Sequence, residues 1–337
     1  MERRVQSTSN VAAVRTSRWL LKSPDKLLNP QFALLRSLVE CIQSQLEQPG
    51  DTIDRNQEVD IVISGGGLRG YYVTGAFIVL KQLQEAFGWK ICRFAGASAG
   101  SWCAVFMACG MDIVDWVETY YQTRLHSQAS GRPLLDAYHC FLDSMMLITL
   151  PGNAHVLCSG KVFLSITVVE AGFVRNLVVS EFFSKQDVVD ACIASSNIPF
   201  LATSGLGKRF RGMRVLDGGV TNNIPYFRDD ARKQIAFNLS KVQYPLSLTL
   251  SASDPSIEAL LVRGALEMRA FVTTPGYRVA SIEVVEKGQR PRSSLSAWLR
   301  CVAPAKSVLL VLLVALLYRR FKRRRFTYGL PSGTLLL

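Results

Sequence analysis

The chain has 337 residues, 49% of them hydrophobic, which suits one large or two ordinary folded domains and excludes a disordered protein. Its eight cysteines show neither zinc-ligand nor disulfide spacing, which indicates reduced and mostly buried thiols. The net charge of +13 is concentrated near the two ends, leaving about −2 on residues 27–286. This distribution favours an anionic membrane surface over nucleic acid as the partner of the basic segments.

Two segments precede the main domain. Residues 1–26 are rich in Arg and Ser and lack the apolar run of a secretory signal. We interpret them as a disordered arm, with a mitochondrial-type presequence as the alternative. Residues 27–58 contain an amphipathic helix, predicted at 31–46 from its helical spacing, and a polar linker.

The main domain, 59–286, opens with an alternation of strands and helices. An apolar strand at 59–64 leads through the glycine-rich turn 65–70 into a helix that Gly88 ends. A second strand at 91–94 is followed by a small-residue helix at 99–109. This order predicts βαβ architecture with a parallel sheet.

The remainder of the domain continues as mixed α/β. The further predicted elements are a helix at 112–125, strands at 161–169 and 173–178, a helix at 186–194, strands at 209–216, 235–239 and 246–250, and a helix at 257–272. Residues 126–160 have no regular pattern, and we interpret them as a mobile cap.

The glycine-rich turn is compatible with more than one function. Gly65, Gly67 and Gly70 fit the G-x-G-x-x-G fingerprint of dinucleotide-binding proteins. That fingerprint requires a carboxylate at the end of the second strand, where this chain has Cys92-Arg93-Phe94. The Walker A pattern also fails, because no Gly-Lys-Ser/Thr follows. The alternative is a turn whose backbone N–H groups face an oxyanion, with Arg69 close by.

The segment Gly96-Ala97-Ser98-Ala99-Gly100 has the G-x-S-x-G pattern of a serine nucleophile on a strand-to-helix turn. We expect the two glycines to permit a sharp bend and to leave room for a substrate beside the hydroxyl. The following helix would direct its positive N-terminus at Ser98 and favour an oxyanion there. Taken alone, the pattern is equally compatible with simple packing of small residues.

A base for this serine is the next requirement. Asp217-Gly218-Gly219 follows a predicted strand, and by itself it is typical of a β-turn with an Asx hydrogen bond. All three histidines of the chain precede Asp217, so the chain order Ser, Asp, His of serine hydrolases with this elbow is excluded. Asp217 therefore remains as the base for Ser98, with burial strengthening the carboxylate as a base and glycine N–H groups stabilising the anion.

Three motifs in this order resemble the patatin-like phospholipase family. They are G-G-G-x-R-G at 65–70, G-x-S-x-G at 96–100 and D-G-G at 217–219. Ala194-Ser195-Ser196 with Pro199, and Asn223 with Pro225, agree further, and the resemblance covers residues 59–240.

The resemblance implies a three-layer α/β/α sandwich with a mainly parallel central sheet. It implies Ser98 as nucleophile, Asp217 as base, and Gly66, Gly67 and Arg69 around an oxyanion hole, within a turn that includes Gly65 and Gly70. Gly96, Gly100, Gly218 and Gly219 support these motifs. The implied reaction is hydrolysis of fatty-acyl esters of phospholipids or acylglycerols through an acyl-serine, without metal or cofactor.

The basic tail, 287–337, contains ten apolar residues at 308–317, flanked by Lys306 and by the basic run 319–325. Ten residues are too few to span a bilayer, but a helix over 298–321 would reach about 36 Å at ~1.5 Å per residue. We interpret this segment as a membrane anchor, spanning or in-plane, with the catalytic domain on the cytosolic side. Basic flanks on both sides leave its orientation and organelle open.

The sequence therefore predicts a membrane-attached serine esterase of the lipase or phospholipase type. A lipid transacylase using the same two residues is one alternative. The other is a nucleotide-binding or catalytically silent membrane scaffold. The preferred lipid and the oligomeric state stay open.

Overall fold

A computed structural model describes most of the main domain. The described residues are 33–46, 53–119, 122, 146–170, 173–198, 208–229, 232–243 and 257–285. Several predicted features lie outside these described residues: the strand at 246–250, most of the cap, both ends of the chain and the anchor at 298–321.

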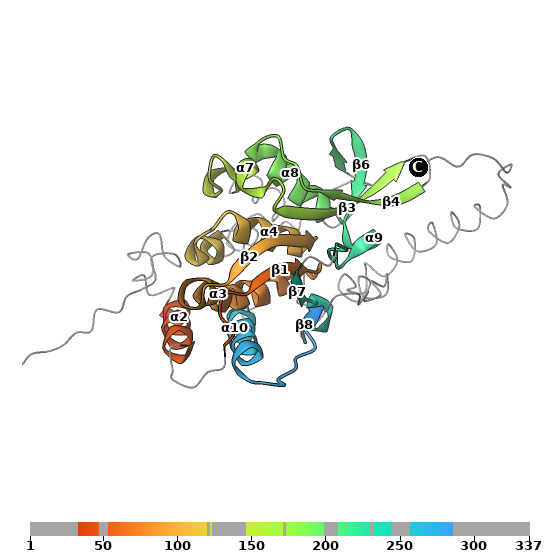
Figure 1. The fold of residues 1–337 in the computed structure, drawn as a ribbon. Coiled ribbons are helices and arrows are strands. Elements are labelled where there is room, and N and C mark those ends of the chain that lie inside the picture. The colour runs from red at the N-terminus through yellow and green to blue at the C-terminus, as the bar shows by residue number, and fades with distance from the viewer. Residues whose placement is uncertain are drawn as a thin grey trace, which may run out of the picture.

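One mixed sheet runs through the described part of the chain (Figure 1). Its strands are β1 (Glu58–Ile63), β2 (Lys90–Ala97), β3 (Val162–Glu170), β4 (Phe173–Val179), β5 (Lys208–Phe210), β6 (Met213–Leu216), β7 (Lys233–Phe237) and β8 (Ile282–Val285). Their order is β5-β6-β3-β2-β1-β7-β8, with β4 also paired to β3. The central strands β3, β2, β1 and β7 are parallel, and the outer pairings are antiparallel. The prediction of an α/β protein with a mainly parallel central sheet is confirmed.

The described helices, apart from two short ones at 154–158 and 219–222 that the sequence did not predict, agree with the predicted ones within a few residues. They are α2 (Ala33–Leu46), α3 (Gly70–Phe87), α4 (Ala99–Ala108), α7 (Ala154–Cys158), α8 (Lys185–Ser195), α9 (Gly219–Asn222) and α10 (Ile257–Thr273), with 3-10 turns η2 (Gly67–Arg69) and η3 (Leu239–Lys241). Gly88 ends α3 in the left-handed conformation, with φ of 73°, as its position predicts. The helix predicted at 112–125 is confirmed over 113–119.

The two faces of the sheet are covered differently. Alternate residues of β1, such as Ile61 and Ile63, belong to the large core that α2, α3, α4, α7, α8 and α10 share. In Figure 1, α2 and α10 lie beside α3, so helices from the start and from near the end of the described chain meet there. The opposite face carries Val62 and Ala236 in a smaller cluster with Ile224. On that face the side chain of Thr167 contacts that of Thr221 in α9.

The parallel strands bring several turns to one edge of the sheet. β1, β2 and β7 run in the same direction, so the turns that follow Ile63, Ala97 and Phe237 are neighbours. The carboxyl edge of a parallel sheet is where α/β proteins bind ligands. No helix among the described residues has both the length and the apolar character to cross a membrane.

Candidate active site

Ser98 occupies a sharp turn between β2 and α4. Its φ is 53° and its ψ is −124°, a conformation that non-glycine residues adopt at a steric cost. The residue is 8% exposed, and it directly precedes the first residue of the ten-residue helix α4. A strained serine at a helix N-terminus matches the geometry that the G-x-S-x-G pattern predicts.

The glycines beside Ser98 are required for backbone packing. A β-carbon on Gly96 would lie 2.2 Å from the Gly100 carbonyl oxygen. A β-carbon on Gly100 would lie 2.4 Å from the carbonyl oxygen of Ile63 at the end of β1. The expectation that these glycines leave room for a substrate is therefore wrong, because neighbouring backbone fills that space.

The glycine-rich turn lies directly against Ser98. A β-carbon on Gly65 would lie 3.0 Å from the Ser98 β-carbon and 2.8 Å from Oδ1 of Asn223. The Gly65 N–H donates a hydrogen bond to that same Asn223 oxygen, at 3.1 Å. Gly67 has φ of 58°, a conformation that favours glycine.

The N–H groups of this turn differ in their availability. The Gly65 N–H donates to Asn223, and the Gly70 N–H donates to carbonyl groups within the η2 turn. Within the described ranges, no hydrogen bond from the N–H of Gly66 or Gly67 is found. These two groups can therefore donate to a ligand. Arg69 is buried in the same turn.

Asp217 follows the last residue of β6 and is fully buried. Its Oδ1 accepts a hydrogen bond from the Gly219 N–H at 2.8 Å, so the Asx turn that the sequence suggested is present. Its N–H donates to the Asn197 carbonyl oxygen, and its own carbonyl oxygen accepts from the Thr167 hydroxyl, both at 2.8 Å. The backbone of Asp217 is thereby fixed on both sides.

One residue, Ser195, connects the turns that carry Ser98 and Asp217. Its Oγ accepts a hydrogen bond from the Ser98 N–H at 2.9 Å and donates to the Ser165 carbonyl oxygen at 2.7 Å. Its carbonyl oxygen accepts from the N–H of Gly218 at 2.8 Å. Two segments far apart in the chain are thus bound to the same serine at the end of α8.

Close backbone contact reinforces this connection. Ala97, which precedes Ser98, pairs with Ser165 in the register of β2 and β3. A β-carbon on Gly218 would lie only 1.9 Å from the Ser165 carbonyl oxygen. The Asp217 turn is therefore packed against the residue that neighbours the Ser98 turn.

The sequence did not predict an individual role for several polar residues at this edge. Ser195 and Asn223 belong to motifs noted for their family resemblance, whereas Asn197 and Thr167 gave no comparable signal. Only the alternation of hydroxyl side chains in β3, at Ser165 and Thr167, marked a polar side of that strand.

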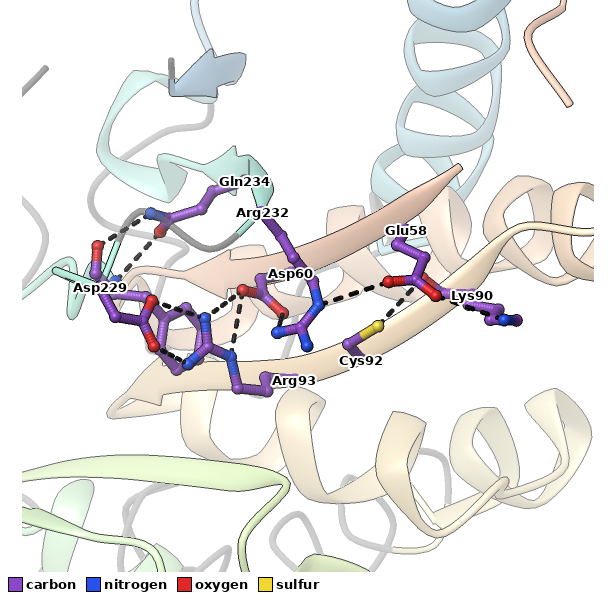
Figure 2. A network of polar contacts seen from close by, with 9 residues as sticks. Glu58, Asp60, Lys90, Cys92, Arg93, Asp229, Arg232 and Gln234 are labelled. Atoms are coloured by element: carbon purple, nitrogen blue, oxygen red, sulfur yellow. Dashed lines mark hydrogen bonds and ion pairs between the residues drawn. The ribbon is translucent and has the colours of Figure 1, made fainter. Parts of the chain in front are cut away.

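Figure 2 shows how the segment after Asn223 is attached to the sheet. The Arg93 guanidinium of β2 forms ion pairs with Asp60 of β1 and with Asp229, and lies 4.0 Å from the ring centroid of Phe227. Hydrogen bonds to Asp229 and Asp60 raise the pKa of Arg93. The side-chain amide of Gln234 bonds both the N–H and the carbonyl oxygen of Phe227. These contacts hold residues 226–229 on the face of the sheet opposite the large core.

Of the three histidines, the structure describes His155. His155 lies in α7, which precedes β3 and so belongs to the opposite edge of the sheet from Ser98. No group of three or more potential metal-binding side chains occurs in the described part.

Comparison with known proteins gives relatives for about half of the chain. The mouse 1-acylglycerol-3-phosphate O-acyltransferase Pnpla3 is 34% identical over 177 residues, covering 51% of this chain and 42% of the relative. The human omega-hydroxyceramide transacylase is 30% identical over 169 residues, covering 49% of this chain and 31% of the relative. The human patatin-like phospholipase domain-containing protein 4 is 29% identical over 174 residues, covering 50% of this chain and 67% of the relative.

Two further comparisons add little. The heterodimeric complex ExoU-SpcU of the Pseudomonas aeruginosa type III secretion system aligns with a TM-score of 0.39 and 12% identity, over 82% of this chain and 62% of that chain. No family model matches the chain. The chain spans less than half the length of the first two relatives it matches.

The fold and the Ser98 turn define an α/β protein with a serine on a strand-to-helix elbow. Its relatives, which include patatin-like phospholipase domain-containing proteins 2 and 4, support the resemblance to the patatin-like phospholipase family.

Proposed function

We propose that this protein is a lipid acyl hydrolase with Ser98 as nucleophile and Asp217 as base. The observation that carries the proposal is Ser195, which holds the strained Ser98 turn and the buried Asp217 turn together. The substrate class, fatty-acyl esters of phospholipids or acylglycerols, comes from the family that the chain resembles.

The reaction proceeds in two halves. Asp217 accepts the proton of the Ser98 hydroxyl as Oγ attacks the ester carbonyl carbon. The N–H groups of Gly66 and Gly67, the N-terminus of α4 and the nearby Arg69 stabilise the oxyanion. Asp217 returns the proton to the leaving alcohol, and an acyl-Ser98 remains. Water, deprotonated by Asp217, then releases the fatty acid and restores Ser98.

A second candidate function uses the same intermediate. The names of two relatives describe acyl transfer, an O-acyltransferase and a transacylase. If a lipid hydroxyl replaces water in the second half, the acyl group passes from Ser98 to that lipid. A carboxylate base and an oxyanion hole serve both outcomes equally, and access of water to the acyl-Ser98 decides between them.

We further propose that residues 298–321 attach the enzyme to a membrane, with the catalytic domain 59–286 on the cytosolic side. The apolar run 308–317 and its basic flanks support this assignment. Attachment at the C-terminus would keep the domain close to its lipid substrate.

The test uses the full chain in detergent with mixed micelles of phospholipid or acylglycerol. Wild-type protein is expected to release fatty acid and to react with a fluorophosphonate probe. Ser98→Ala should abolish both, whereas Ser180→Ala, at the residue that directly follows β4, should leave both unchanged. Probe labelling and hydrolysis that persist in Ser98→Ala would contradict the proposal. Addition of a lipid alcohol separates transfer from hydrolysis.

A further inference from the structure

The Asn223 side chain contacts Gly65 of the glycine-rich turn, on the side of Gly65 that also faces Ser98. Its Oδ1 and the Ser98 β-carbon both lie within 3.0 Å of the same point beside Gly65. Asn223 is 2% exposed and directly follows α9, the short helix that begins two residues after Asp217. It therefore belongs to the same edge of the sheet as the proposed catalytic pair.

The orientation of this amide is determined by its neighbour. The Gly65 N–H is a donor, so the atom it contacts at 3.1 Å must be the amide oxygen. The Nδ2 group is consequently directed elsewhere. It is buried and has no hydrogen-bond partner among the residues that the structure describes.

A buried amide donor without a partner is costly and therefore uncommon in folded proteins. Such groups are tolerated where a ligand supplies the missing acceptor. The Asn223 segment is also held firmly beyond Pro225, since Arg93 and Gln234 fix residues 226–229 on the sheet (Figure 2). The amide is thus anchored before any substrate binds, as a donor to a developing charge should be.

We propose that Nδ2 of Asn223 donates a hydrogen bond to the acyl carbonyl oxygen of the ester substrate as Ser98 attacks it. This inference rests on the proposed function. The acceptor is the carbonyl oxygen because Asn223 is bonded to Gly65, the immediate neighbour of the Gly66 and Gly67 donors. Asn223 is then a catalytic residue, adding a third donor to the oxyanion hole.

The experiment compares two substitutions of Asn223 with a control at Asn222, all in the full chain. Asn223→Asp keeps an oxygen for the Gly65 N–H and removes the Nδ2 donor, whereas Asn223→Ala removes both. Asn222→Asp introduces the same charge one residue away, in a side chain that has no assigned role. The readouts are kcat and KM for an ester substrate, and the thermal midpoint.

Loss of one oxyanion-hole donor lowers kcat by about 10²–10³-fold. We expect that loss in Asn223→Asp, with KM close to wild type and a thermal midpoint lowered by the buried carboxylate. Asn222→Asp should stay within about 3-fold of wild-type kcat. If Asn223→Ala does not fold, Asn223→Asp alone decides the question.

Two results would overturn the inference. If Asn223→Asp keeps wild-type kcat, Asn223 only positions Gly65, whether or not Asn223→Ala loses kcat. The proposed function would then stand. Equal losses in Asn223→Asp and Asn222→Asp would assign the effect to charge. A wild-type protein without Ser98-dependent hydrolysis would remove the proposed function and this inference together.

Discussion

The carboxyl edge of the sheet and the contact between α3 and α10 are built from similar parts. At the edge, Gly218 lies so close to β3 that a β-carbon would be 1.9 Å from the Ser165 carbonyl oxygen. At the helix contact, a β-carbon on Gly264 would be 1.8 Å from the Tyr72 carbonyl oxygen. Each region also holds a carboxylate, Asp217 at the edge and Glu267 in α10.

The regions differ in what surrounds the carboxylate. Glu267 accepts hydrogen bonds from the Tyr72 hydroxyl at 2.6 Å and the Ser281 hydroxyl at 3.1 Å, and pairs with Arg263 at 2.6 Å. These partners tie three chain segments together. Asp217 instead accepts a hydrogen bond from the Gly219 N–H, and Ser195 links its turn to the turn of the strained Ser98.

This difference shows which features indicate chemistry. Interlocked glycines occur in both regions, so they report close backbone packing and nothing more. The edge of the sheet differs in two features. It has backbone strain at a nucleophilic side chain, and it has hydrogen-bond donors without a partner among the described residues. Those features support the assignment of the active site.

The largest expected effect separates the two carboxylates. Asp217→Asn should lower kcat by about 10³–10⁴-fold, because the amide cannot accept the Ser98 proton. Its stability should change little, since the amide oxygen can still accept the hydrogen bond from the Gly219 N–H. Glu267→Gln should retain the kcat of folded protein and lose about 1.5–3 kcal/mol of unfolding free energy. Steady-state kinetics and urea unfolding measure the two quantities. Loss of stability without loss of kcat in Asp217→Asn would place Asp217 with the structural carboxylates.

The interlocked glycines should show a smaller, shared effect. A β-carbon at Gly218 or Gly264 would collide with backbone, so each alanine variant should lose about 2–3 kcal/mol of unfolding free energy. At Gly264 this loss should exceed the gain of about 1 kcal/mol from the better helix propensity of alanine. Gly218→Ala should also lower kcat, since it moves the Asp217 turn.

Gly152→Ala is the matched control for both variants. A β-carbon there meets no described atom within 4 Å, and the residue does not have a positive φ. Its unfolding free energy should stay within about 0.5 kcal/mol of wild type. A Gly264→Ala variant as stable as this control would show that the two helices can separate at little cost.

The smallest expected effect concerns pH at the helix contact. Burial, and then the hydrogen bond to Glu267, raise the pKa of Tyr72 above its usual value of about 10. The folded state therefore favours the neutral phenol, and its stabilising effect is complete below pH ~10 and declines as pH rises further. Tyr72→Phe should cost about 1 kcal/mol near pH 8. The difference from wild type should narrow above pH 10, as urea unfolding from pH 8 to 11 would measure, and a constant difference would contradict this interpretation.

Local elements were predictable because their signals lie within short windows. Helical spacing with Gly88 identified α3, and the G-x-S-x-G pattern identified the turn at Ser98. The short antiparallel strand β8 was not predicted, since four residues carry too little periodicity. The predicted strand at 91–94 extends to Ala97, because pairing with β1 and β3 continues through the small residues after Phe94.

The sequence by itself determined the class of fold, the family resemblance and the residue types at the candidate site. Only the tertiary structure decided how those residues meet: Ser195 bonds both turns, and the Asn223 amide contacts Gly65. It also decided that Gly96 and Gly100 accommodate neighbouring backbone. The physical reason is that strand register and backbone packing arise between segments distant in the chain, where no local pattern of residues records them.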